Sequence, residues 1–262
     1  MTTVLAIKSK DGIILASDSQ GTSSKIKTSV KKIFKINDHV GIGTSGDSSQ
    51  IELFVDEIKQ NFQNEIELES EFKAQMYSFM VNLHRLYNYN HSFLCGYTGV
   101  RLFFTPFSVA AVIPRNGDSC IYRMGFGTTG KNNEVSPYLY RVNHDYVSIG
   151  SGSSYARLVL AQQDRLYSAI NKKLSDLSIE HNVGISAYVI NEVKQLDLET
   201  GGKIQIAIVN RDGYKELSSA EQFKHYQTMT DNLSSLMNEY FSKPDKTSEI
   251  FRHIFPMSND LP

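Results

Sequence analysis

The order in which strand-like and helix-like segments follow one another restricts the fold of this chain more than any other feature. Strand-like segments occur in blocks joined by short turns, as in Thr3–Ile7 and Gly12–Ser17, which meet at the turn signal Asp11-Gly12. Two consecutive helix-like segments separate one block from the next. A parallel doubly wound fold would alternate single strands with single helices instead. The order therefore predicts an α+β protein, a four-layer α-β-β-α sandwich of two antiparallel sheets flanked by helices.

The predicted elements follow from residue type and period. Strands are expected where β-branched and apolar residues run between turn signals, at Thr3–Ile7, Gly12–Ser17, Lys32–Ile36, His39–Thr44, Leu102–Phe104, Phe107–Ile113, Ser119–Met124, Tyr146–Ile149, Ile204–Val209 and Lys215–Leu217. Helices are expected where apolar residues recur with helical spacing, from Asp47 or Ser48 to about Phe62 and over Ser70–Tyr87, Ser154–Asn171, Ser178–Lys194 and Glu221–Phe241. We expect one domain over residues 1–218, with 219–262 as its C-terminal helical extension.

Charge and apolar run length exclude several classes of function. The chain has 27 Lys and Arg against 28 Asp and Glu, so it lacks the basic surface typical of proteins that bind nucleic acid or anionic membranes. Apolar runs such as Phe107–Ile113 are far shorter than the ~20 residues of a membrane-spanning helix. Cys95 and Cys120 lack the spacing of a metal site. We therefore expect a cytoplasmic protein with no metal, no cofactor, no nucleic acid partner and no membrane.

The first two residues offer a specific chemistry. Met1 precedes Thr2, a small residue, so removal of the initiator methionine would leave threonine with a free α-amine. An α-amine has a pKa near ~7.7–8.0, so a fraction of it is neutral at pH 7 and able to take the hydroxyl proton. One residue would then supply both nucleophile and base. Many chains begin with Met-Thr, so this feature alone favours a threonine with no catalytic role.

Six short segments, taken in order, resemble proteasome-type β subunits and the related bacterial two-ring threonine protease. The resemblance implies the fold of the N-terminal nucleophile hydrolases, which agrees with the order of strands and helices above. It covers Thr2 to about Leu217 and departs most over Ala74–Asp145. The matching segments are Thr2-Thr3-Val4, Asp11–Thr22, Lys31-Lys32-Ile33, Gly43–Asp47, Ser148–Ser153 and Asp197–Gly202.

The resemblance also implies a role for each site residue. Thr2 matches the nucleophile, Lys32 the lysine beside its hydroxyl, and Asp18 the carboxylate that orients this lysine. Gly46 matches the residue whose backbone N–H stabilises the oxyanion. Supporting positions near the Thr2 amine are matched by Ser151, Asp197 and Thr200. Without the resemblance, a surface ion pair is the favoured interpretation of Asp18 and Lys32. Gly46 is then a turn glycine, Ser151 a helix cap and Asp197 a loop acid.

Two details of the match differ from the family pattern. The family usually has serine where this chain has Thr200, which keeps the hydroxyl and adds a methyl group. The segment between Thr22 and Lys31 is also about two residues shorter than in the family. We assign the site lysine to Lys32 rather than Lys31 because Ile33 follows it and only one of two neighbouring strand residues can face Thr2.

The resemblance further implies a peptide-binding pocket beside Thr2. Glycine and valine in its wall, and no fixed charge nearby, predict that it accepts apolar or small side chains of the substrate at the P1 position. The extended peptide would hydrogen-bond to the pocket backbone like an added strand. The residues implied for substrate binding are Gly21, Thr22, Val30, Thr44 and Ser48.

Three functions are compatible with these residues. The first is a threonine endopeptidase that cleaves peptides or unfolded proteins through an acyl-enzyme, within a self-compartmentalising homo-oligomeric ring served by an ATP-dependent unfoldase. The second is another acyl-transfer enzyme on the same fold, an amidase or peptide ligase. The third is a catalytically inactive subunit with a structural role in the ring, which would follow at once if Met1 were retained.

Overall fold

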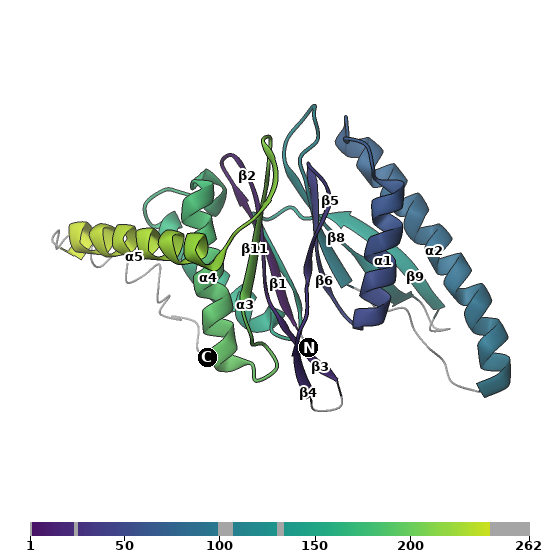
Figure 1. Ribbon diagram of the computed structural model, residues 1–262. Helices are drawn as coiled ribbons and strands as arrows, with labels where there is room; N and C mark the ends of the chain where they lie inside the picture. The colour runs from purple at the N-terminus through teal and green to yellow at the C-terminus, as the bar shows by residue number, and fades with distance from the viewer. Residues whose placement is uncertain (1, 24–25, 99–106, 130–133, 242–262) are drawn as a thin grey trace, which may run out of the picture.

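Two five-stranded antiparallel sheets pack face to face, and helices cover their outer faces (Figure 1). The computed structural model describes residues 2–23, 26–98, 107–129 and 134–241. Among these residues the layers follow one another as helices, sheet, sheet, helices. The predicted four-layer α+β sandwich is therefore confirmed.

The first sheet contains both the first strand and the last strands of the described chain. Its strands lie in the order β10-β1-β2-β11-β12. Helices α3 and α4 cover its outer face, and α5 packs on α4 so closely that a Cβ on Gly184 would lie 2.5 Å from Met229 Cβ (Figure 1). The elements are β1 (Thr3–Ser9), β2 (Gly12–Asp18), β10 (Tyr146–Gly150), α3 (Ser153–Ser168), a 3-10 turn (Leu174–Asp176), α4 (Ile179–Leu196), β11 (Ile204–Asn210), β12 (Gly213–Glu216) and α5 (Ser219–Phe241).

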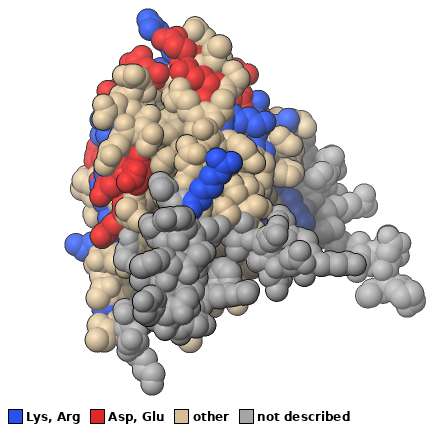
Figure 2. Space-filling model, turned by 90° about the vertical axis from the view of Figure 1, so that its right-hand side faces the viewer, with Lys and Arg blue, Asp and Glu red and all other residues tan. Residues whose placement is uncertain are grey.

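The second sheet is formed by the middle of the chain, in the order β5-β6-β7-β8-β9. Helices α1 and α2 cover its outer face with an apolar side that includes Phe54, Phe72 and Met76. On the face shown in Figure 2, acidic and basic side chains are interspersed over the described residues. The elements are β5 (Ile33–Asn37), β6 (Val40–Ser45), α1 (Ser48–Asn61), α2 (Glu69–Thr98), β7 (Phe107–Val112), β8 (Cys120–Thr129) and β9 (Glu134–Arg141).

The two sheets approach closely near the start of β1. Val4, Leu15, Val109 and other small apolar side chains fill the space between them. Gly43 in β6 faces Val4, and a Cβ at that position would lie 2.5 Å from Val4 Cγ1. The missing side chain thus allows the N-terminal end of β1 to lie directly over the end of β6.

Two β segments and one helix end differ from the sequence prediction. The hairpin β3 (Gln20–Ser23) and β4 (Ile26–Ser29) was not predicted, because its residues are mostly polar and do not alternate. Strand β9 was missed because Pro137 argues against a strand, yet β9 lies at a sheet edge, where proline is tolerated. Helix α2 runs to Thr98 rather than Tyr87, since no glycine or proline follows Tyr87 before Gly96.

Some expectations fall outside what the structure describes. The predicted strand Leu102–Phe104, the side chain of Cys95 and residues 242–262 lie outside the described residues. Cys120 is buried and unbridged, and burial raises its pKa to about 12. The division at residue 218 stays a prediction. None of the helices within the described ranges is long and apolar enough to cross a membrane.

Candidate active site

Thr2 lies at the N-terminal end of β1, almost buried between the two sheets. Its backbone nitrogen donates a hydrogen bond to Ser151 Oγ (3.1 Å). Gly150 makes this approach possible, because its φ is 93° and a Cβ there would lie 2.0 Å from the Thr2 carbonyl oxygen. The turn from β10 into α3 therefore fixes the main chain of Thr2.

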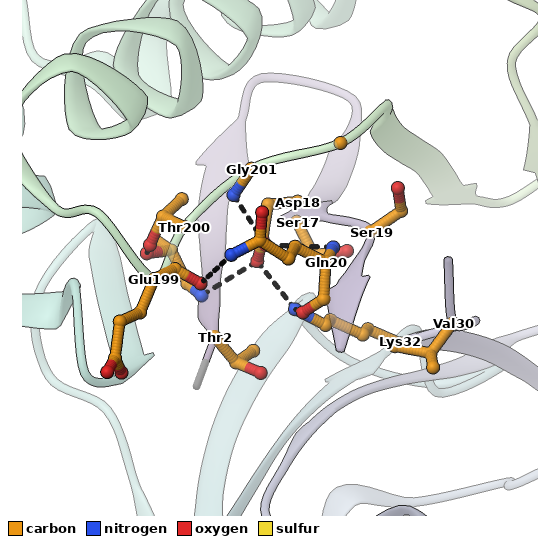
Figure 3. Close-up of polar contacts among 12 residues, drawn as sticks. Thr2, Ser17, Asp18, Ser19, Gln20, Val30, Lys32, Glu199, Thr200 and Gly201 are labelled. Atoms are coloured by element: carbon orange, nitrogen blue, oxygen red, sulfur yellow. Dashed lines mark hydrogen bonds and ion pairs between the residues drawn. The ribbon is translucent and has the colours of Figure 1, made fainter. Parts of the chain in front are cut away.

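Asp18, the last residue of β2, is completely buried and accepts four hydrogen bonds (Figure 3). Its Oδ1 accepts from Lys32 Nζ (2.8 Å) and from the Thr3 N–H (2.9 Å). Its Oδ2 accepts from the N–H groups of Gln20 and Gly201 (both 3.0 Å). Donors of this kind stabilise the ionised carboxylate. Asp18 thus joins the start of β1 to a lysine from the segment before β5 of the other sheet.

Lys32 reaches Asp18 from the segment that leads into β5, and its side chain is only 3% exposed. Its Nζ also donates to the Gln20 carbonyl oxygen (2.7 Å). Burial lowers the pKa of Lys32 below its ordinary value of 10.5, while Asp18 opposes that shift. The neighbouring Lys31 is about half exposed and pairs with Glu216 (2.6 Å) instead of Asp18. Of the two adjacent lysines, Lys32 is the one at the site.

Ser151, Asp197 and Thr200 form a second hydrogen-bonded group beside Thr2. Asp197 Oδ2 accepts from Thr200 Oγ1 (2.7 Å) and from Ser151 Oγ (3.2 Å). The Thr200 hydroxyl also lies 2.7 Å from that of Thr3. The Thr200 hydroxyl is therefore hydrogen-bonded to both Asp197 and Thr3. The group ends at Ser151 Oγ, which accepts a hydrogen bond from the Thr2 N–H.

Thr2, Lys32 and Gly46 all line one cavity of about 390 Å³. Gly46 lies between β6 and α1 with a φ of 140°, which favours glycine. The cavity is large enough for one or two side chains of a bound peptide. Thr2, Lys32 and the backbone of Gly46, just before α1, therefore border the same cavity.

The predicted substrate-binding residues divide into two groups. Gly21, Val30 and Ser48 line the cavity. Thr44 and Thr22 do not line it. Thr44 is buried and its N–H donates to the Lys32 carbonyl oxygen (2.8 Å), while Thr22 pairs with Lys27 in the β3–β4 hairpin.

The expectation that no fixed charge lies near the pocket is wrong. Lys31, Asp47 and Glu52 also line the cavity. Glu52 lies one helical turn after Ser48 on α1, so it shares the face that Ser48 presents to the cavity. The prediction failed because it considered the pocket residues of the resemblance and not the rest of that helix face.

Three further residues support the site and were not predicted. The Gln20 carbonyl oxygen accepts from Lys32, and Gly201 donates to Asp18, as described above. Gln205 in β11 binds the backbone on both sides of Lys31. Gln20 and Gly201 lie within segments that carried the resemblance, whereas Gln205 showed only as a polar residue in an apolar strand. Over the described ranges, no three His, Cys, Asp or Glu residues gather as metal ligands.

A sequence model of the family described as "Proteasome subunit" matches residues 1–209. The chain belongs to the proteasome subunit family. Its relatives include a proteasome subunit alpha of Methanobrevibacter smithii, 27% identical over 89% of this chain and 82% of the relative. A proteasome subunit beta 2 of Pyrococcus abyssi is 24% identical over 84% and 91%. A proteasome subunit beta 1 of Pyrococcus furiosus is 24% identical over 82% and 95%.

This proteasome subunit therefore resembles alpha and beta subunits at similar levels of identity. The residues around Thr2 distinguish its site. Those residues come from β1, β2, the segment before β5, the start of α3 and the loop after α4. The family fold brings all five segments to the same end of the two sheets.

Proposed function

We propose that this proteasome subunit is a threonine-type endopeptidase whose nucleophile is the Thr2 hydroxyl, exposed for reaction once Met1 has been removed. The observation that carries the proposal is the buried ion pair between Lys32 and Asp18, whose lysine lines one cavity with Thr2 and Gly46. Burying two charges costs free energy that a purely structural contact seldom needs. A lysine in that position serves the chemistry of a nearby hydroxyl.

The first half of the reaction uses the Thr2 residue itself. The Thr2 nitrogen, which donates to Ser151 Oγ, becomes a free α-amine once Met1 is removed and takes the hydroxyl proton as Oγ attacks the peptide carbonyl carbon. The positive charge of Lys32 lowers the pKa of that hydroxyl. The carbonyl oxygen becomes negative and is stabilised by the Gly46 N–H. Asp18 holds Lys32 in place throughout.

The second half releases the products. The α-ammonium gives its proton to the leaving nitrogen, so the C–N bond breaks and an ester remains on Thr2 Oγ. Water then attacks the ester carbon, the amine takes a proton from that water, and the acid product leaves as Oγ is protonated again. Asp197 and Thr200 orient Ser151, which keeps the amine aligned through both halves.

The substrate is a peptide or an unfolded protein bound in extended form. Gly21, Val30 and Ser48 line the cavity that takes the side chain next to the cleaved bond. Asp47 and Glu52 add two carboxylates to this cavity. Lys31 and Lys32, which also line the cavity, form their ion pairs with Glu216 and Asp18, which lie outside it.

The setting proposed for this activity is a homo-oligomeric ring in the cytoplasm, supplied by an ATP-dependent unfoldase. Membership of the proteasome subunit family supports the ring. A ring would enclose the cavity beside Thr2, which on a single subunit opens to solvent. Residues 219–262 are proposed as an extension of the catalytic domain. Helix α5 belongs to this extension and packs on α4 of the domain.

Intact mass spectrometry before and after incubation with a peptide epoxyketone tests this function. The reagent forms a stable double adduct only with a hydroxyl and a free α-amine on the same residue. We expect loss of Met1, one adduct per chain, and no adduct on Thr2→Ala.

Three results would contradict the proposal. A retained Met1 with no adduct would support the inactive structural subunit instead. Adduct formation by Thr2→Ala would show another nucleophile. Transfer of the acyl group to an added amine, without hydrolysis, would indicate a peptide ligase on the same fold.

A further inference from the structure

The segment 30–32 carries two parts of the site, yet it belongs to neither neighbouring strand. Val30 forms a wall of the active-site cavity and Lys32 reaches Asp18. A second cavity of about 430 Å³ lies behind the same segment, and Ser29, Val30 and Lys31 line both spaces. Because packing supports it weakly on two sides, the position of this segment depends on its backbone hydrogen bonds.

A single side chain from the first sheet, that of Gln205, supplies two of those bonds. Gln205 Oε1 accepts from the Lys32 N–H (2.9 Å), and Nε2 donates to the Val30 carbonyl oxygen (2.6 Å). Ser19 and Thr44 supply the others, since the Ser19 oxygen accepts from Val30 and the Thr44 N–H donates to Lys32. Gln205 therefore binds the main chain on both sides of Lys31.

The amide group suits this task for a simple reason. Residues 30 and 32 of an extended chain present backbone groups to the same side, one as acceptor and one as donor. A side-chain amide carries one acceptor and donor hydrogens at matching separation, whereas a carboxylate accepts only and an alkyl group does neither. The backbone of Gln205 is itself paired with Ser17 of β2, so the amide rests on a central strand.

We infer that Gln205 is a positioning residue: it fixes the backbone of Val30 and Lys32 so that the ammonium group meets Asp18 and the valine wall faces the substrate. This inference rests on the proposed peptidase function. Gln205 does not line the active-site cavity and acts through the segment it holds.

Loss of the amide frees the segment to move toward either cavity. A displacement of about 1 Å at a catalytic group can lower a rate by 10²-fold. Movement of Lys32 changes kcat and the pH at which activity declines. Movement of Val30 changes the KM of peptides according to their side chain next to the cleaved bond. A residue with a merely structural role would alter neither.

The test compares Gln205→Leu and Gln205→Glu with a matched control. Gln222→Leu serves as the control, because Gln222 lines the second cavity together with Gln205, does not line the active-site cavity, and donates to the Leu217 carbonyl oxygen (2.9 Å). Two readouts are combined: the hydrogen-exchange rate of the Lys32 amide and the steady-state kinetics on a fluorogenic peptide across pH.

We expect Gln205→Leu to lower kcat by about 10- to 100-fold, to move the alkaline decline of activity, and to speed exchange of the Lys32 amide. Gln205→Glu keeps the acceptor for that amide, and its kcat is expected to fall less than that of Gln205→Leu. Gln222→Leu is expected to match the wild type in both readouts. If Gln205→Leu does not fold, Gln205→Glu is compared with the wild type and the control instead.

The outcomes separate this inference from the proposed function. Unchanged exchange of the Lys32 amide in Gln205→Leu would overturn the inference, as would faster exchange with unchanged kcat and pH profile. A wild-type protein without peptidase activity or epoxyketone adduct would overturn the proposed function instead. In that case faster exchange would still show that Gln205 holds the segment.

Discussion

Lys32 Nζ lies 2.8 Å from Asp18 Oδ1, and both side chains are almost completely buried. Asp18 ends β2 of the first sheet and Lys32 lies in the segment that leads into β5 of the second, so their contact also links the two halves of the sandwich. Burying a pair of charges lowers the stability of the fold unless further hydrogen bonds compensate for the lost hydration. Here the Thr3, Gln20 and Gly201 N–H groups provide them. The first prediction concerns this pair.

Lys32→Ala is expected to lower kcat/KM by at least about 10²-fold, because the charge that lowers the Thr2 hydroxyl pKa is removed. It also leaves the Asp18 carboxylate buried without its partner, at a cost of about 3–5 kcal/mol in the free energy of unfolding. Lys31→Ala is the control and is expected to retain activity. Peptidase assays and urea unfolding check both effects. Equal losses in the two variants would show that the site lysine is wrongly assigned.

The pH dependence of activity and of stability should run in opposite directions. Burial lowers the folded-state pKa of Lys32, so between that pKa and 10.5 the unfolded chain binds more protons than the folded chain. This group therefore adds stability as pH rises through that window. Activity falls there because the ammonium charge is lost.

Two measurements check this opposition. We expect kcat/KM to decline before pH 10.5, and the urea midpoint of wild type to rise relative to Lys32→Met over the same range. An alkaline decline of activity only at or above pH 10.5, together with parallel urea midpoints, would contradict the prediction.

Gly150→Ala is expected to displace Thr2. Its φ is 93° and the new Cβ would lie 2.0 Å from the Thr2 carbonyl oxygen, so the variant gains strain and a backbone clash. Gly117→Ala is a close control, with a φ of 120° but no atom within 4 Å of the Cβ. Both variants should lose about 1–3 kcal/mol from strain, whereas only Gly150→Ala should lose adduct formation. Normal reactivity of Gly150→Ala toward the epoxyketone would refute the prediction.

Glu52→Gln should change substrate preference. Glu52 lines the cavity, and we expect it to favour a basic side chain next to the cleaved bond. Its removal should lower the ratio of kcat/KM for arginine over leucine at that position by roughly tenfold, equal to about 1.4 kcal/mol. Asp56→Asn on the same helix does not touch the cavity and is the control. A ratio that stays constant in Glu52→Gln would assign the preference to other residues.

The sequence specified the layers well because period and turn chemistry are local properties. The helix pairs and the hairpin at Asp11-Gly12 appear where residue pattern placed them. Local pattern failed where tertiary context overrides it. Pro137 is acceptable in β9 only because that strand has a free edge, and this cannot be read from residues 134–141 alone.

The site was accessible to sequence reasoning only in part. Resemblance placed Asp18 and Lys32, 14 residues apart, as partners, and they lie in contact. Nothing in the sequence indicated that Gln205 binds a segment 173 residues away, because such a contact depends on how the two sheets stack. Glu52 was equally hidden, since its relevance depends on which helix face borders the cavity.

The distribution of Asp18's partners along the chain has a consequence for biosynthesis. The carboxylate binds groups at residues 3, 20, 32 and 201, so its shell is incomplete until about residue 201 has left the ribosome. A nascent chain holding only the first half of the protein already contains Thr2 and Lys32 but lacks the Gly201 donor and the Asp197 group. The order of synthesis therefore delays completion of the site until most of the chain that surrounds it has been made.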